Sequence, residues 1–183
     1  MGRSFESITD QMAAFVPNQH LFFVATAPSG DGGHVNLSPK GLDSFRVLGP
    51  NRVAYLDLTG SGAETIAHVR ENGRITFMFC AFEGKPDIVR FYGRGQVHRP
   101  GDDTFDELRS LFGDHDAVRS VITADIARTS SSCGFAVPLM EHVGDRHTLG
   151  KYFENKSDDD VEAYWAEKNE TSIDGLPAVD IPG

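Results

Sequence analysis

The chain has 183 residues, enough to bury a substantial core, and we expect one domain over residues 1–183. Its formal net charge is −10, from 17 Lys and Arg against 27 Asp and Glu, which argues against nucleic acid as a general partner because phosphate backbones require clustered basic surface. The longest strongly apolar stretch, residues 21–27, is too short to span a bilayer and the N-terminus lacks a secretory pattern, so we expect a cytoplasmic protein with no membrane partner.

The first part of the chain is predicted to contain one amphipathic helix and two β-hairpins. Apolar residues at three- and four-residue steps predict a helix over residues 5–16. A β-rich segment at 20–27 is joined by a Gly-rich turn to 35–38, which predicts the first hairpin. The second hairpin is predicted to join 46–48 to 52–58.

A loop rich in glycine and hydroxyl groups follows, over residues 59–65. Ser61 and Glu64 have the spacing of a capping box, which predicts a helix that begins at Ser61. The first N–H groups of a helix lack internal partners and the helix dipole favours an anion there. Together with Lys40 at the end of the first hairpin, this junction predicts a phosphate site; the alternative is an ordinary capped surface helix, since no Walker loop is present.

The second part of the chain alternates between strands and helices. Asn72-Gly73 is predicted to be a helix C-cap and a turn. The strands at 74–82 and 87–98 follow, and Gly93 and Gly95 predict a bend in the second strand of the kind that closes barrels. Three further elements are predicted: a helix over 100–113, a short helix over 117–123 and a strand over 126–143.

The last part of the chain contains a second capping box, Ser157 with Asp160, which predicts another helix before an irregular tail over 169–183. Cys80 and Cys133 lie in apolar, strand-like surroundings, so we expect reduced, buried thiols rather than a disulfide. The seven histidines show no metal-ligand spacing, and we predict no metal site.

These elements predict a mainly β fold with α-helices at its periphery, a small β-barrel. The order of the motifs NLSPKG, YLDLTGSGAETI, RENGRI, RFYGRG, CGFAVP and SIDGLP resembles the pyridoxamine 5′-phosphate oxidase-like family, the FMN-binding split barrels, over nearly the whole chain. The resemblance implies a six-stranded split barrel that forms a homodimer, with FMN at the subunit interface.

The resemblance also implies which residues contact FMN. The strand that ends at Lys40 lies beside the flavin, Lys40 itself contacts FMN, the loop and helix start hold the phosphate, and residues near the C-terminus approach from the partner subunit. The implied cofactor-binding residues are Asn36, Leu37, Ser38, Pro39, Lys40, Gly41, Thr59, Gly60, Ser61, Glu64, Thr65, Asn169 and Ser172.

The sequence departs from the family pattern at the phosphate site and at the C-terminus. Family oxidases carry Ser-Arg-Lys where this chain has Ala-Glu-Thr at 63–65, so other groups, with Arg70 or Arg94 assisting, must hold more of the phosphate. The C-terminal Trp and Arg segment of those oxidases has no counterpart, so oxidation of pyridoxamine phosphate is not expected. Trp165 is interpreted as a core or interface aromatic, with flavin stacking as the alternative.

We therefore expect an FMN-dependent oxidoreductase that acts on a small molecule and uses a reduced nicotinamide or another donor. The redox chemistry would belong to the cofactor, so no catalytic residue is assigned. Two alternatives stay open: a flavin-binding or sensing protein without turnover, and a member of the same fold that binds a deazaflavin or heme.

Overall fold

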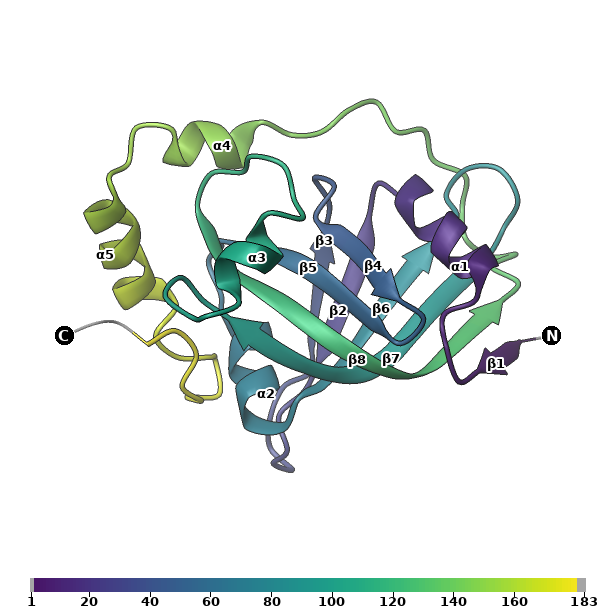
Figure 1. The fold of residues 1–183 in the computed structure, drawn as a ribbon, viewed down its shortest axis with the longest axis horizontal. Helices are drawn as coiled ribbons and strands as arrows, with labels where there is room; N and C mark the ends of the chain where they lie inside the picture. The colour runs from purple at the N-terminus through teal and green to yellow at the C-terminus, as the bar shows by residue number, and fades with distance from the viewer. Residues whose placement is uncertain (1, 181–183) are drawn as a thin grey trace.

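The computed structural model describes residues 2–180, and its centre is one antiparallel β-sheet that curves strongly (Figure 1). The strands run in the order β3-β2-β6-β7-β8-β5-β4, and β1 pairs with β8. In the described part of the chain the strands are β1 (Arg3–Phe5), β2 (Phe22–Thr26), β3 (Asn36–Lys40), β4 (Phe45–Gly49), β5 (Arg52–Leu58), β6 (Arg74–Cys80), β7 (Ile88–His98) and β8 (Val118–Ser132).

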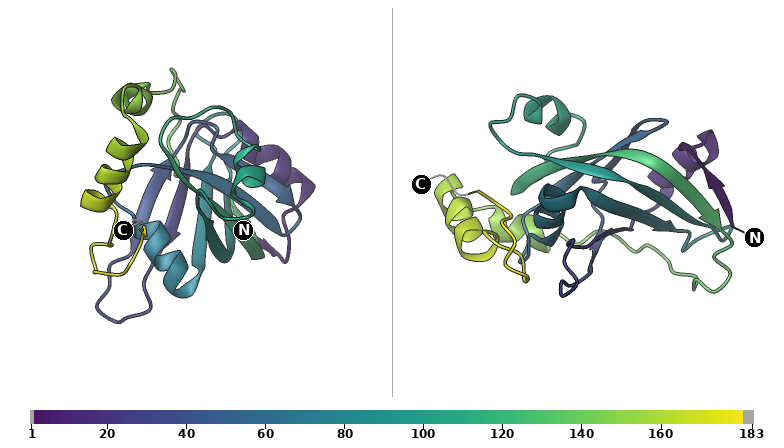
Figure 2. Two further views of the ribbon diagram at one scale, coloured as in Figure 1. Left: turned by 60° about the vertical axis from the view of Figure 1, so that its left-hand side comes forward. Right: turned by 90° about the horizontal axis from the view of Figure 1, so that it is seen from below.

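Helices lie around the sheet rather than within it. In Figures 1 and 2, α1 lies at one end of the sheet, while α4 and α5 lie at the other end. Their bounds are α1 (Asp10–Phe15), followed by a 3-10 turn (Val16–Asn18), α2 (Glu64–Asn72), α3 (Phe105–Arg109), α4 (Thr148–Phe153) and α5 (Asp158–Lys168). No helix within residues 2–180 has the length and apolarity needed to cross a bilayer.

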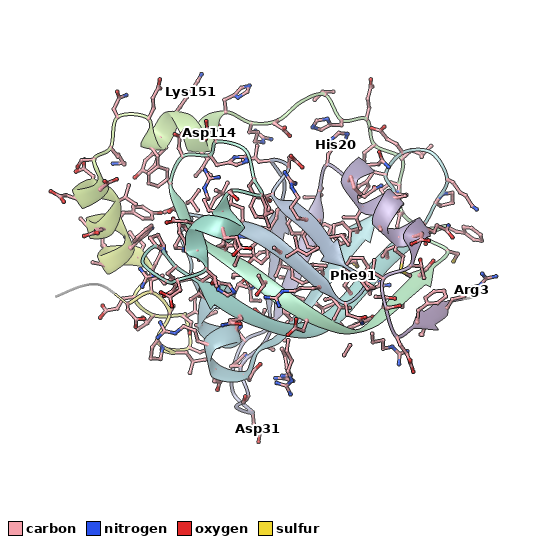
Figure 3. All side chains as sticks on the ribbon, viewed as in Figure 1. Arg3, His20, Asp31, Phe91, Asp114 and Lys151 are labelled. Carbon is pink, nitrogen blue, oxygen red and sulfur yellow. The ribbon has the colours of Figure 1, made fainter. Side chains whose placement is uncertain are left out.

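Aromatic side chains fill the interior of the curved sheet. Their ring centroids lie 4.9 to 6.4 Å apart, mostly in edge-to-face arrangements, the geometry that aromatic pairs prefer. Alternating side chains supply them, because successive residues of a strand point to opposite faces. The cluster consists of Phe22, Phe45, Tyr55, Phe77, Phe79 and Phe91, of which Phe91 is labelled in Figure 3.

The bend predicted in the strand over 87–98 is present in β7. The pairing of β7 with β8 shifts register between Tyr92 and Gly93. A Cβ at Gly93 would lie 2.3 Å from the carbonyl oxygen of Asp125, so only glycine allows the two strands to approach at this point.

The structure confirms the fold class and most of the predicted elements. Both hairpins, the strands β6 and β7, the left-handed C-cap at Gly73 and the capping box of α5 are where the sequence predicts them. Both cysteines are free, and Cys80 is buried. The prediction that Cys133 is also buried is wrong, because this residue follows the end of β8 and is exposed.

Three other predictions are wrong for identifiable reasons. The helix predicted over 5–16 begins only after Thr9, whose side chain caps it, because Arg3–Phe5 pairs with β8 instead. The helix predicted over 100–113 is shortened to Phe105–Arg109. In place of the predicted helix over 117–123, residues 118–123 form the start of β8, which pairs with β5 and β7 on its two sides; a short buried run rich in Val and Ile fits a strand as well as a helix.

The segment after β8 also differs from the prediction. The strand predicted over 126–143 ends at Ser132, and residues 133–147 contain no helix or strand. This connection crosses the top of the view in Figure 1 and leads into α4, a helix that the sequence analysis did not predict.

Candidate functional site

The loop between β5 and α2 does not contain the predicted capping box. Helix α2 begins at Glu64 rather than Ser61, and its N-cap residue, Ala63, has no side chain that can accept a hydrogen bond. The Glu64 carboxylate instead accepts a hydrogen bond from the backbone N–H of Ile173, at 3.0 Å. Within residues 2–180, no side chain therefore caps the first turn of α2, and its backbone donors are available to an anion.

Two buried side chains hold this loop in place. Arg119 of β8 donates through Nη1 to the carbonyl oxygen of Gly62, at 2.9 Å. The amide of Asn169 donates to the carbonyl oxygen of Gly60, at 3.0 Å. Arg119 also donates to the Oδ1 atom of Asn169, at 2.8 Å, so the two side chains support each other. The loop conformation is thus fixed from below by side chains distant in the sequence.

Thr59 closes the base of the loop. Its hydroxyl donates to the carbonyl oxygen of Ala117, at 2.8 Å, and accepts from the indole N–H of Trp165, at 2.9 Å. Trp165 is buried against the core, which confirms its interpretation as a core aromatic. An indole N–H normally finds a partner when it is buried, and here that partner fixes α5 to the loop.

Asp57 is a buried carboxylate beneath the loop, and two cationic side chains lie next to it. Its carboxylate accepts from Arg119 Nε at 2.9 Å and from the Ser120 hydroxyl at 3.2 Å, and Lys40 Nζ lies 3.5 Å away. Burial opposes ionisation of Asp57, but the charges of Arg119 and Lys40 and these hydrogen bonds outweigh it and hold the pKa of Asp57 below its usual value. Lys40 is thus a half-buried lysine beside an anion, not a solvated residue at a strand end.

The inward side of β3 forms a polar network with α2. Asn36 donates to the hydroxyls of Thr26 at 3.2 Å and Thr65 at 3.1 Å, and accepts from Ser38 at 3.0 Å. The Thr26 hydroxyl in turn lies 3.0 Å from Nδ1 of His68, which is fully buried. Three predicted cofactor residues, Asn36, Ser38 and Thr65, are therefore joined by hydrogen bonds, which connect β3 to the first turn of α2.

Two buried polar atoms near this network lack a partner in the described part of the chain: the Tyr55 hydroxyl and Nε2 of His68. Burial raises the pKa of Tyr55 well above its usual value, and the charge of Asp57 raises it further. Thr65 lies close enough to lower that pKa slightly, although the two hydroxyls do not meet hydrogen-bond geometry.

The remaining predicted residues lie in three places. Leu37 and Pro39 are exposed on the outward side of β3, away from the polar network. Ser172 lies in the tail, where its hydroxyl accepts from the backbone N–H groups of Asp174 and Leu176, so it shapes a turn of the tail. Gly41 lines the cleft described next.

A cleft of about 680 Å³ opens beside the loop. One wall comes from the loop and from the end of β3, with Thr59, Gly60, Ser61 and Gly41. The other wall comes from the segment 142–164, which includes α4. His20, at the top of the sheet in Figure 3, reaches across to this wall and stacks on His142, with ring centroids 3.7 Å apart.

Two cations predicted to assist the phosphate are used elsewhere. Arg70 pairs with Asp180 at 2.9 Å and also donates to the carbonyl oxygen of Ala178. Arg94 donates to the carbonyl oxygen of Asn72, at the far end of α2. The suggestion that either supports a phosphate at the start of α2 is therefore wrong. No group of three or more His, Cys, Asp or Glu in the described residues could hold a metal ion.

Asp57 and Arg119, which organise the site, are not among the residues predicted from the sequence. Asp57 carried a usable signal, since it is a charged residue inside the otherwise apolar strand 52–58 and its burial requires a partner. Arg119 carried none, because the residues around it were predicted to be helical.

Comparison with known proteins agrees with the fold. A family model described as pyridoxamine 5′-phosphate oxidase matches residues 8–133. The pyridoxamine 5′-phosphate oxidase family protein ustO from Aspergillus flavus is 41% identical over 194 residues, covering 96% of this chain and 77% of that protein.

Solved structures share the fold at lower identity. HupZ from Group A Streptococcus aligns with a TM-score of 0.53 and 23% identity, covering 68% of this chain and 99% of HupZ. A protein from Lactobacillus delbrueckii that carries the family's name aligns with a TM-score of 0.52 and 20% identity, covering 68% of this chain and 94% of the other. Because the family match spans residues 8–133 and the identity to ustO is 41% across almost the whole chain, this protein belongs to the pyridoxamine 5′-phosphate oxidase family.

Proposed function

We propose that this protein is an FMN-binding flavoprotein that acts as an oxidoreductase on a small molecule. The observation that carries the proposal is the uncapped start of α2 above a buried cationic network. A helix start with unused N–H donors in a fixed loop is suited to a phosphate group. Family membership supplies the second support, since the motifs at this loop are those that resemble the flavin-binding split barrels.

The residues present fit a phosphate. Around Gly60, the described residues leave the space where a Cβ would stand free of any atom within 4 Å, so the loop is open to a bulky group. Ser61 is exposed and offers a hydroxyl beside it, and the side chain of Lys40 is 23% exposed, enough to reach a ligand. Glu64, the acid that interrupts the family pattern, is turned toward the backbone of Ile173.

Bound FMN would supply the redox chemistry, by accepting and donating reducing equivalents. The residues of the chain would bind and orient it. The start of α2 and Lys40 would hold the phosphate, while Asn36 and Ser38 would hold the inward side of β3 in register with the first turn of α2. Arg119 would act beneath the loop as a positioning residue, because its contacts are to the loop backbone.

We further propose that the protein works as a homodimer with the cofactor at the interface. Strand β3 lies at an edge of the sheet and exposes Leu37, at 61%, and Val35, directly before the strand, is 74% exposed. Ile173, 72% exposed, follows Ser172 in a tail that His34 and Asp174 hold against the β2–β3 loop. Exposed apolar side chains gathered at a sheet edge favour coverage by another chain. Sedimentation at graded protein concentrations tests this proposal.

The first experiment is an absorption spectrum of the purified protein, with mass spectrometry of any molecule released on denaturation. We expect a flavin spectrum and the mass of FMN. A deazaflavin or heme spectrum would show that the protein binds that cofactor instead of FMN. Steady-state assays with a reduced nicotinamide then test turnover. If protein fully occupied by FMN shows no turnover with any electron donor, the oxidoreductase proposal is contradicted.

The second experiment tests the phosphate site. Lys40→Ala should weaken FMN binding by about 1–3 kcal/mol, the range for a charge-assisted hydrogen bond. Lys85→Ala is the matched control, because Lys85 lies exposed in the turn before β7 and should leave the affinity unchanged. Equal affinities of both variants in a fluorescence titration would remove Lys40 from the site.

A further inference from the structure

The cleft beside the phosphate loop has walls of different origin. The wall formed by Thr59, Gly60 and Ser61 lies inside the family-matched range, 8–133. The opposite wall, formed by residues of the segment 142–164, lies entirely after that range. The cleft therefore combines residues of the family-matched range with residues that the family model does not describe.

Aromatic rings dominate the wall at 142–164. Tyr152, Phe153 and Tyr164 pack against one another, with ring centroids 4.9, 6.3 and 5.9 Å apart. Phe153 is buried, whereas Tyr152 is 53% exposed and lines the cleft, and the Lys156 ammonium covers part of the Tyr152 ring, with Nζ 4.9 Å from the ring centroid. The stacked pair of His20 and His142 adds two further flat rings. A planar aromatic molecule matches this wall better than an aliphatic one of equal size.

The charges in the cleft favour an acidic group. Arg146 is the only lysine or arginine among the described lining residues, and within residues 2–180 its guanidinium forms no ion pair or hydrogen bond. The one carboxylate of the lining, Asp145, lies 3.3 Å from Nε2 of His142. The cleft thus presents one cation without a partner beside an aromatic wall. Its volume of about 680 Å³ lies within the usual range of small-molecule sites, about 300–1,000 Å³.

We propose that this cleft binds a small planar aromatic acid, with its ring against Tyr152 and its carboxylate at Arg146. The inference deepens the proposed function, because it names the substrate class, and the statement that the ligand is a substrate rests on that function. In Figure 3, the labelled His20 belongs to the sheet side of the cleft, and the labelled Lys151 identifies α4, the helix that contributes Thr148, Leu149, Tyr152 and Phe153 to the other side.

Isothermal titration with three probes tests the ligand class. The probes are 2-naphthoate, its neutral amide 2-naphthamide, and cyclohexanecarboxylate, an acid without an aromatic ring. We expect 2-naphthoate to bind one site per chain and each of the other two to bind about three- to tenfold more weakly. Equal binding of 2-naphthoate and 2-naphthamide would overturn the assignment of the acid, and equal binding of cyclohexanecarboxylate would overturn that of the ring.

Two variants with matched controls assign the residues. Arg146→Gln should weaken 2-naphthoate binding to the level of 2-naphthamide and leave the amide unaffected, whereas Lys151→Gln, in the last turn of α4 and outside this cleft, should change neither. Tyr152→Leu should weaken both naphthyl probes about three- to tenfold, and Phe135→Leu, an exposed aromatic outside the cleft, should weaken neither. Variants that all bind like the unaltered protein would overturn the site.

Repeating the titration with and without FMN separates this inference from the proposed function. If 2-naphthoate binds equally well in both cases, the cleft is a site separate from that of the flavin, as expected. If FMN displaces the probe, the cleft belongs to the flavin and the inference is overturned. A protein that binds 2-naphthoate but fails to take up FMN would contradict the proposed function while leaving the cleft assignment intact.

Discussion

Helices α2 and α5 begin after the same kind of sequence but in different ways. Both starts carry a serine followed three residues later by an acid, Ser61 with Glu64 and Ser157 with Asp160. At α5 the box closes: the Ser157 hydroxyl accepts from the Asp160 N–H at 3.2 Å, and the Asp160 carboxylate accepts from the Ser157 N–H at 3.0 Å. At α2 it does not form, and the helix begins at Glu64 itself.

The difference comes from tertiary contacts, which the spacing cannot encode. The start of α5 is exposed and satisfies its own donors. The loop before α2 is instead held by Arg119 and Asn169, and the Glu64 carboxylate is occupied by the N–H of Ile173. A helix start that satisfies itself has little use for a ligand, whereas one held open by the rest of the molecule retains donors for an anion.

The largest expected effect follows from breaking the support beneath α2. Arg119→Met leaves the Asp57 carboxylate buried without its main partner and releases the carbonyl oxygen of Gly62. Removing one partner of a buried ion pair costs about 3–5 kcal/mol, so urea unfolding should show a loss of that size. Arg128→Met is the control, because Arg128 lies on the same strand but is exposed and should change stability by less than about 0.5 kcal/mol.

A matched pair of serine variants compares the two helix starts directly. Ser157→Ala removes a working N-cap and should lower the free energy of unfolding by about 1 kcal/mol. Ser61→Ala removes no cap and should leave stability within about 0.5 kcal/mol. Only Ser61→Ala should weaken FMN binding, by about 0.5–1.5 kcal/mol for one hydrogen bond. A loss of stability in Ser61→Ala equal to that in Ser157→Ala would show that the predicted capping box forms in solution.

Local signals in the sequence predict the sheet well and the site only in part. Strands such as β2 and β5 are predicted by alternating or continuous apolar residues bounded by turns. Gly73 and Gly93 predict a helix cap and a bend, because Gly73 has a left-handed backbone and Gly93 leaves no room for a Cβ. The capping box predicted at Ser61 does not form, because the conformation of this loop depends on contacts with residues more than fifty positions away, Arg119 among them. The cleft wall at 142–164 could not be predicted either, because the connection before it has no regular spacing of apolar residues that would indicate where the wall lies in the fold.

The acid at the start of α2 allows a smaller change with opposite effects on stability and binding. Glu64→Gln keeps an oxygen for the Ile173 N–H but removes a negative charge from the helix start, which should cost about 0.3–1 kcal/mol of stability. Because an anionic ligand no longer meets that charge, FMN should bind about two- to fivefold more tightly. Asp160→Asn at α5 is the control: it should lose stability without any gain in FMN affinity. Unchanged FMN affinity in Glu64→Gln would place the phosphate away from α2.

The smallest expected effect is a dependence on pH at α2 that α5 does not share. The tail that brings Ile173 to Glu64 is held by Asp174, whose Oδ1 lies 2.7 Å from Nδ1 of His34. The pKa of His34 is raised above 6.5, mainly by its hydrogen bond to Asp174 and then by the negative charge of Asp174. The pKa of Asp174 is lowered below 3.8, mainly by its hydrogen bond with the His34 side chain.

The sign of this dependence follows from the two shifts. The contribution of His34 is complete below its ordinary pKa of 6.5 and is lost as the pH rises through the raised value, and that of Asp174 is complete above 3.8 and is lost as the pH falls through the lowered value. Raising the pH from about 6 to about 8 should therefore speed amide hydrogen exchange of Ile173, after correction for the intrinsic rate, and leave the start of α5 unchanged. His34→Gln should abolish that change, and protection of Ile173 that stays constant over this range would show that the tail is held without the charge of His34.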